Sequence, residues 1–197
     1  MPDEMLGYVV QHRFRSAEGA WPLVQVGPGL LTLNDTRDYT WKAFGIKSRQ
    51  LIDALYSAYP DAPNALQVSS LQLRYIDAIP FDFERADVLR FLADDLKITL
   101  AFSPDLFGDV PVNPAPKSLN AMFEFSTENP LGTLRIRLAR GKHHDSDAVI
   151  LEMVLISEGA DAPAMPASFA TWLDAAHTVI HDTFFEMIKG RLEDQFL

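Results

Sequence analysis

The chain contains no cysteine. This absence excludes disulfides, thiolate nucleophiles, cysteine-ligated zinc and iron–sulfur clusters. Basic residues are also few, with 17 Lys and Arg against 27 Asp and Glu, for a net charge of −10. Nucleic-acid binding requires clustered positive charge, so we expect no nucleic-acid partner. The acidic surface would suit a basic protein partner, or would simply keep the protein soluble.

Long apolar runs are missing as well. The stretch Ala148–Ile156 is among the longest, and it is far shorter than the roughly 20 residues of a membrane-spanning helix. The first residues, Met1–Met5, are acidic and short of apolar side chains, unlike a signal peptide. The sequence therefore predicts no membrane partner and a cytoplasmic location.

What the chain does have is material for a core. Of its 197 residues 48% are hydrophobic, with 13 Phe, 5 Tyr and 3 Trp, which is typical of a folded globular domain. The length favours a single α+β domain over residues 1–197. Four prolines between Pro104 and Lys117 indicate an irregular connection, 104–117, between an N-terminal and a C-terminal half.

Hydrophobic periodicity predicts the elements. Alternating or apolar runs indicate strands at 6–15, 23–26, 30–33, 66–79, 119–125, 134–138 and 149–156, and a strand or a continued helix at 98–102. Helical spacing indicates helices at 41–59, 84–96 and 168–194. Helices are too few to connect parallel strands, so we expect an antiparallel β-sheet with helices packed on one face and a long C-terminal helix. The run 149–156 is nearly all apolar, which places it centrally in the sheet.

Two histidine-rich stretches are candidate chemical sites. Asp174, His177 and His181 share one side of the last predicted helix, and two histidines four residues apart can chelate a metal. Thr178 stands where a zinc-protease motif requires glutamate, so we favour boundary histidines that hydrogen-bond to the sheet, and predict no metal. The second stretch, 142–147, reads as a solvated loop within a charged connection, 141–147.

Three further features have a structural and a functional interpretation. Cationic side chains could hold a phosphate or carboxylate, or could form ordinary ion pairs; they are Arg74, Arg135, Arg137, Arg140 and Lys142. Gly27-Pro28-Gly29 lies between two extended runs and predicts a bend, not a phosphate loop. Aromatic residues could line a ligand pocket between sheet and helix, or fill the core; they are Trp21, Trp41, Phe44, Trp172, Phe184 and Phe185.

Four stretches carry a resemblance to a known family. They are the run 21–29 leading into Leu33-Asn34-Asp35, the spaced Tyr39, Trp41 and Phe44, the run 73–77, and the helix 172–180 followed by Phe184 or Phe185. Over most of the chain from Trp21 on, the sequence resembles a sporadically distributed family of uncharacterised bacterial proteins. That family has no assigned activity. The resemblance implies a shared polar cluster, and thus a ligand-binding candidate, of Asn34, Arg74, Tyr75 and His177.

No catalytic motif stands out, and the sequence predicts no cofactor. We therefore expect a non-enzymatic cytoplasmic interaction or binding module of bacterial type, with a protein partner or a homo-oligomer. The alternative is a small-ligand-binding protein or hydrolase with a cavity between the sheet and the C-terminal helix. That alternative depends on the aromatic set, the segment 104–117 and the polar residues around His177.

Overall fold

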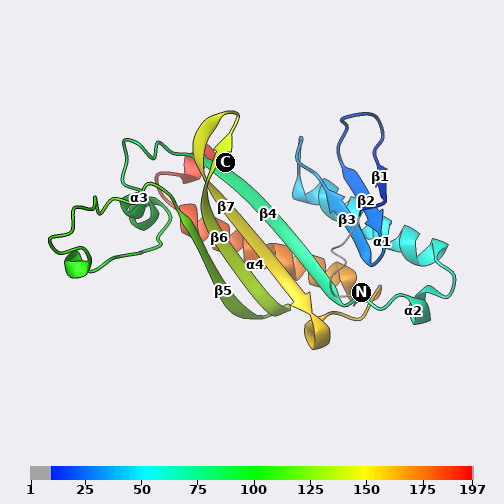
Figure 1. The fold of residues 1–197 in the computed structure, drawn as a ribbon. Coiled ribbons are helices and arrows are strands. Elements are labelled where there is room, and N and C mark those ends of the chain that lie inside the picture. The colour runs from blue at the N-terminus through cyan, green and yellow to red at the C-terminus, as the bar shows by residue number, and fades with distance from the viewer. Residues whose placement is uncertain (1–9, 197) are drawn as a thin grey trace, which may run out of the picture. The chain divides into compact units, whose positions relative to one another are not determined.

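The structure is a computed structural model that describes residues 10–196 (Figure 1). It forms two compact units, one up to Leu66 and one from Gln67. Each contains an antiparallel sheet, and the second also contains the long C-terminal helix. The predicted α+β class is confirmed. The segment 104–117, expected to connect two halves, lies within the second unit, and the single domain over 1–197 stays a prediction.

The first unit holds sheet A and two helices. Its strands follow the order β1-β2-β3 and pair antiparallel. The elements are β1 (His12–Phe14), β2 (Leu23–Gly27), β3 (Leu30–Asn34), α1 (Trp41–Ala58) and α2 (Ala62–Ala65). The predicted bend at 27–29 is the β2–β3 turn, where Gly29 takes a φ of 67° that a β-carbon would disfavour. Part of the predicted strand 6–15 lies outside the described residues.

Local chemistry sets both ends of α1. The Thr40 hydroxyl accepts a hydrogen bond from the Ala43 backbone N–H at 3.3 Å, which caps the first turn. Pro60 disfavours helical geometry at Tyr59, and α1 ends at Ala58. The loop predicted at 61–64 is wrong, because the short helix α2 begins at Ala62, after Asp61 takes a left-handed conformation.

The second unit is built on the four-stranded sheet B, in the order β4-β7-β6-β5. Its strands are β4 (Ser70–Pro80), β5 (Asn120–Glu128), β6 (Leu131–His143) and β7 (Ser146–Glu158). The apolar run 149–156 lies in β7, which pairs with β4 on one side and β6 on the other. The predicted central position is confirmed, and β4 and β5 form the two edges.

The predicted charged loop 141–147 is wrong. Strands β6 and β7 pair as far as His143 and Ser146, so only His144 and Asp145 form the turn. Both adopt positive φ, 47° and 66°, as a tight two-residue hairpin turn requires. The sequence lacks the Asn-Gly signal of such turns, so the hairpin was read as a longer loop.

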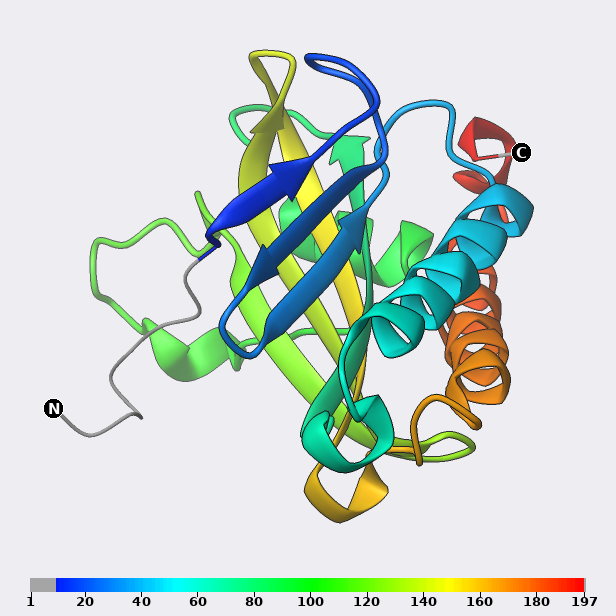
Figure 2. The ribbon, with the colours of Figure 1, turned by 90° about the vertical axis from the view of Figure 1, so that its right-hand side faces the viewer.

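Two helices cover one face of sheet B. They are α3 (Val88–Asp95) and α4 (Phe169–Ile188), and Figure 2 shows both on the same side of the sheet. The last helix was predicted to continue to Asp194, but it ends at Ile188, just before Gly190 takes a φ of 122°. At about 1.5 Å per residue, α4 is roughly 30 Å long rather than roughly 40 Å. No described helix is long and apolar enough to cross a membrane.

The segment after α3 departs from both predicted forms. Residues 98–102 are neither strand nor helix. Lys97 takes a positive φ of 55°, and the Ile98 N–H then donates to the Leu92 carbonyl at 2.9 Å. This turn directs the chain away from the axis of α3, and residues 98–102 that follow it pair with no strand. The Pro-rich stretch that follows contains only one short turn of 3₁₀ helix, Pro104–Leu106.

The core of the second unit lies between sheet B and α4. Odd-numbered β7 side chains from Val149 to Leu155 point into it, and all four are at most 1% exposed. From α4, Trp172, Leu173, Ala176 and Ile180 are also buried. The helix packs against β4 and β7, which are adjacent in the sheet.

Candidate functional site

Tyr75 on β4 and His177 on α4 form the closest pair among the predicted site residues. The Tyr75 hydroxyl lies 3.0 Å from His177 Nδ1, and the two rings lie side by side with centroids 6.1 Å apart. Burial lowers the pKa of His177, and the neighbouring His181 lowers it further, while Asp174 and Asp182 act in the opposite direction. Depending on its tautomer, the neutral imidazole accepts at Nδ1 from the phenol O–H or donates from that nitrogen to the phenol oxygen.

Asp77 extends this face of β4. It follows Tyr75 by two residues, which places both side chains on the same side of the strand. Burial raises the pKa of the Asp77 carboxyl. Sequence reasoning missed Asp77, although its alternation with Tyr75 could have pointed to it. The Asp77 carboxyl, whose pKa is raised, and the His177 imidazole, whose pKa is lowered, therefore both lie on the helix-facing side of sheet B.

Arg74 lies on the other face of sheet B from Tyr75. Its guanidinium Nε lies 2.6 Å from the Glu152 carboxylate, which Arg137 also approaches at 3.6 Å. Arg135 pairs with Glu124 at 2.8 Å. The arginines of this face are matched by carboxylates from neighbouring strands, which is the ion-pair interpretation of the cationic group and leaves no assembled anion site.

Arg140, near the end of β6, contacts a different set of residues. It pairs with Asp147 at 2.5 Å and donates to the Lys117 carbonyl at 2.7 Å. Its guanidinium also lies over the Phe83 ring, 4.8 Å from the centroid. Arg140 therefore fastens residues 83 and 117 to the inner strand β6, which is a structural role.

Asn34 belongs to sheet A. Its side-chain amide donates to the Gln25 side-chain oxygen at 3.1 Å and to the Thr32 hydroxyl at 3.1 Å. Thr32 also donates to Gln25 at 3.3 Å. The amide of Asn34 thus takes part in a polar network across β2 and β3 of its own unit.

The histidine pair has no third metal ligand. The His177 and His181 rings are 5.2 Å apart between centroids, while His181 Nδ1 lies 3.0 Å from the Asp182 carboxylate. Within residues 10–196, no group of three or more His, Cys, Asp or Glu side chains is placed to hold a metal ion. The interpretation of histidines hydrogen-bonded to the sheet holds for His177, which contacts Tyr75 of β4, whereas His181 pairs with Asp182 of its own helix.

Of the two interpretations of the aromatic set, core packing holds for the residues around Trp172 and Phe184. Trp172 is 5% exposed, and its indole N–H donates to the Ser157 hydroxyl at 2.8 Å. Phe184 packs edge-on against Phe185 and Phe196, with centroids 5.4 and 5.1 Å away. These aromatic residues belong to the core and the C-terminal packing, and none of them lines the groove described next.

A groove of about 700 Å³ runs between sheet B and the C-terminal half of α4. We call it the β5–α4 groove. Phe123 and Phe125 of β5 and Ile136 of β6 line one wall. The other walls come from residues 96–100 after α3 and from Asp182, Thr183, Glu186 and Met187 of α4. The lining is mostly apolar, and its charged groups lie on α4 and at Lys97.

The width of the sheet explains this groove. Four strands about 4.8 Å apart measure about 14 Å between the outermost axes, whereas a single helix is about 10–12 Å wide. Because α4 lies over β4 and β7, the same face of β5 is only partly covered. Phe125 is 51% exposed there. Uncovered apolar surface of this kind marks binding sites.

The charged groups at the groove are largely paired. Lys97 lies 3.6 Å from the Glu186 carboxylate, and Lys189 approaches the same carboxylate at 3.2 Å. The two ammonium groups lower the pKa of the Glu186 carboxyl through hydrogen bonding and charge. The rim is therefore close to charge-balanced, and the groove offers apolar contact more than charge.

Comparison with known proteins gives no relative. No protein-family model matches the chain, no curated protein matches it, and no solved structure matches it.

Proposed function

We propose that this chain is a non-catalytic binding protein whose β5–α4 groove receives an apolar segment of another polypeptide. The observation that carries the proposal is the exposed apolar face of an edge strand. Phe125 is 51% exposed beside a groove of about 700 Å³, on a strand that pairs only with β6 in sheet B.

The edge of β5 favours a polypeptide ligand. An edge strand presents backbone N–H and C=O groups that an incoming extended segment can pair with. Side chains of an added strand alternate between the two faces of the sheet. Every second side chain would then extend the apolar wall formed by Phe123 and Phe125 and enter the groove. Backbone pairing and apolar burial would act together.

The polar residues support a non-catalytic role. Tyr75, Asp77 and His177 do not line the groove, and of its lining only Lys97, Asp182 and Glu186 carry charge. Lys97 and Glu186 pair with each other. A general acid or base must reach the proton that it transfers. Asp77 and His177, whose pKa values are shifted, lie outside the lining of the groove, so they could not act on a ligand bound there.

A small apolar molecule is the second candidate ligand, and the groove's volume favours it. Ligand pockets commonly measure about 300–1,000 Å³, and this one falls within that range. Native mass spectrometry of gently purified protein distinguishes the candidates. A small excess mass, far below that of one chain, indicates a small ligand, whereas the added mass of a second chain or of another polypeptide indicates a polypeptide ligand.

The proposal is tested with Nile red, a neutral dye that fluoresces in apolar sites. At a protein concentration below about 1 µM, the wild-type chain is expected to bind the dye and Phe125→Glu to lose at least tenfold in affinity. Met122→Glu is the matched control. Met122 lies on the same strand, is 58% exposed and points to the opposite face. Equal dye binding by all three chains would refute the groove as the binding surface.

A further inference from the structure

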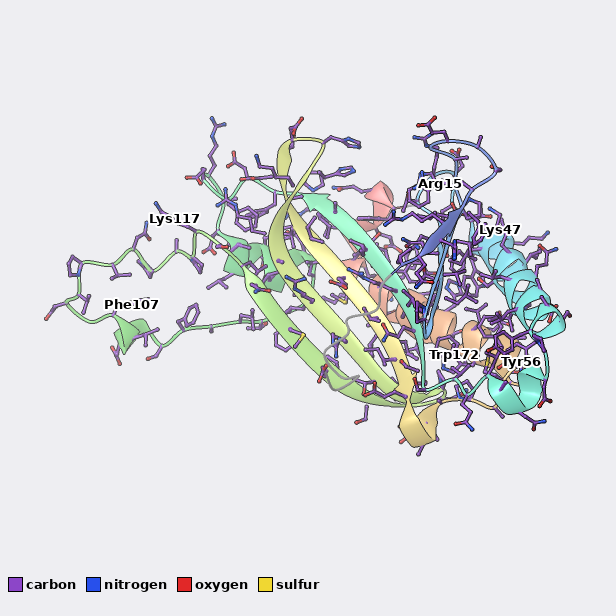
Figure 3. The ribbon with its side chains drawn as sticks, turned by 45° about the vertical axis from the view of Figure 1, so that its right-hand side comes forward. Arg15, Lys47, Tyr56, Phe107, Lys117 and Trp172 are labelled. Carbon is purple, nitrogen blue, oxygen red and sulfur yellow. The ribbon has the colours of Figure 1, made fainter. Side chains whose placement is uncertain are left out.

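A second apolar surface lies next to the β5–α4 groove. Residues 101–112, which we call the apolar arm, leave the groove wall at Leu100 and extend away from sheet B (Figure 3, where Phe107 marks the arm). Four of its apolar side chains are about half exposed: Phe102 at 57%, Leu106 at 55%, Val110 at 58% and Val112 at 48%.

The arm is stiff and anchored at its base. Pro104 and Pro111 fix their own φ angles and restrict the residues before them. Short-range hydrogen bonds, including Val110 N–H to Phe107 carbonyl at 2.8 Å, shape the tip. The return segment is held where Arg140 donates to the Lys117 carbonyl at 2.7 Å. These restraints hold the arm's apolar side chains away from the sheet of its own chain.

Arm and groove therefore both present partly exposed apolar surface on one molecule. We propose that the β5–α4 groove binds the apolar arm of a second copy of this chain, in a reciprocal dimer. The inference rests on the proposed function and names its partner. Because the arm starts at the groove wall, a two-fold axis near Leu100 lets both arms cross and both grooves fill at once, as an isologous dimer requires.

The net charge of −10 predicts how this dimer responds to salt. Two copies with the same charge repel each other, and salt screens that repulsion over about 10 Å at 0.1 M. Burial of apolar side chains is not weakened by moderate salt. Dimer formation is therefore expected to strengthen between about 0.05 and 0.5 M NaCl.

Because the chain lacks cysteine, single cysteines can report the contact without background. Leu106→Cys places a thiol on the arm, and Thr183→Cys places one on the α4 wall of the groove. An equal mixture of the two variants, under mild oxidation, is expected to give a disulfide-linked heterodimer in high yield. Ile76→Cys replaces Thr183→Cys in the control, since Ile76 is 55% exposed on the opposite face of sheet B.

Light scattering after size exclusion supplies the second readout. The wild-type chain is expected to form a dimer at about 100 µM, and Phe102→Glu with Leu106→Glu is expected to leave it monomeric. An absent Leu106–Thr183 link, a link equally strong with Ile76→Cys, or a wild-type chain that stays monomeric would overturn the proposal. If the arm variant still binds Nile red and Phe125→Glu does not, the groove stands as a binding site and only the second copy is refuted as its partner.

Discussion

Trp172 of α4 donates its indole N–H to the Ser157 hydroxyl of β7 at 2.8 Å, and Ser157 in turn donates to the Leu131 carbonyl at 2.5 Å. This relay joins the start of α4 to two strands of sheet B. Ser157 has no exposed surface. The relay therefore fastens the start of α4 to the β7 side of sheet B, and the apolar face of β5 is left partly exposed.

Replacing Ser157 by Ala is expected to lower the free energy of unfolding by about 1–3 kcal/mol, because it leaves the buried Trp172 N–H without its acceptor and removes the hydrogen bond to the Leu131 carbonyl. Urea denaturation measures this loss. Ser126→Ala, on exposed β5, is the control and should change stability by less than about 0.5 kcal/mol. Equal effects from the two substitutions would show that the relay does not fasten α4.

Gly132 is required by a close backbone approach. A β-carbon there would lie 2.2 Å from the Ile156 carbonyl oxygen and 2.8 Å from Ser157 Oγ, and φ is +153°. Gly132→Ala is expected to destabilise the fold by about 3 kcal/mol, through forced displacement of β7 as well as backbone strain. The control is Gly159→Ala, where φ is +58° and no atom lies within 4 Å.

Backbone strain alone should make Gly159→Ala cost about 1 kcal/mol. The difference between the two glycine variants, measured by thermal or urea unfolding, reports the contact with β7 together with the greater backbone strain at a φ of +153°. Similar losses for both variants would contradict the close approach.

Asp95 at the end of α3 is held by Arg191, beyond α4. Arg191 Nε donates to Asp95 Oδ1 at 2.7 Å, and Arg191 Nη2 donates to the second carboxylate oxygen. The Asp95 side chain is 2% exposed. Arg191→Ala is therefore expected to lower the free energy of unfolding, because the buried Asp95 carboxylate loses both donors.

Lys189→Ala provides the control for Arg191, since Lys189 only pairs with the exposed Glu186. Exposed pairs contribute about 0–1 kcal/mol. If both substitutions have equally small effects in urea denaturation, the Asp95–Arg191 pair does not fasten the C-terminal segment.

Much of this fold follows from periodicity in the sequence. Apolar runs place β7 in the centre of sheet B, and alternation along 71–76 places Tyr75 and Arg74 on opposite faces. The errors occur where a few backbone angles decide the outcome. Positive φ at Lys97, and at His144 and Asp145, turns the chain where the side chains give no signal.

The candidate site was only partly predictable. Tyr75 and His177 are 102 residues apart in the chain yet 3.0 Å apart in space, and their pairing was expected only through a family resemblance. That resemblance also grouped Arg74 with Tyr75, although strand alternation places their side chains on opposite faces of β4. Arg74 pairs with Glu152 instead. The β5–α4 groove depends on the lateral position of α4 over sheet B, which no local pattern encodes.

The lowered pKa of His177 predicts a pH effect on stability. Burial disfavours the imidazolium, so the folded-state pKa lies below the ordinary value of 6.5. The unfolded chain therefore takes up a proton first as pH falls, and the free energy of unfolding should decrease from pH 6.5 downward. The Asp77 carboxyl has a folded-state pKa above its ordinary value of 3.8. At pH values just above 3.8 it therefore increases the free energy of unfolding as pH falls, opposite to the effect of His177.

Urea denaturation between pH 8 and pH 5, for the wild-type chain and His177→Gln, isolates the histidine's share. The variant should lose less stability than the wild-type chain over this range, and an NMR titration of the His177 ring should give a pKa below 6.5. Identical pH profiles for the two chains would contradict the assignment.

The central claim, that the β5–α4 groove is the binding surface, is tested most directly by NMR with a bound apolar probe. Amide shifts would be recorded for the chain carrying Phe102→Glu and Leu106→Glu, with and without Nile red. The account predicts that the largest shifts fall at Ile98, Phe123, Ile136 and Met187, which line the groove. Shifts centred instead on Ile76 and Met122, on the opposite face of sheet B, would contradict it.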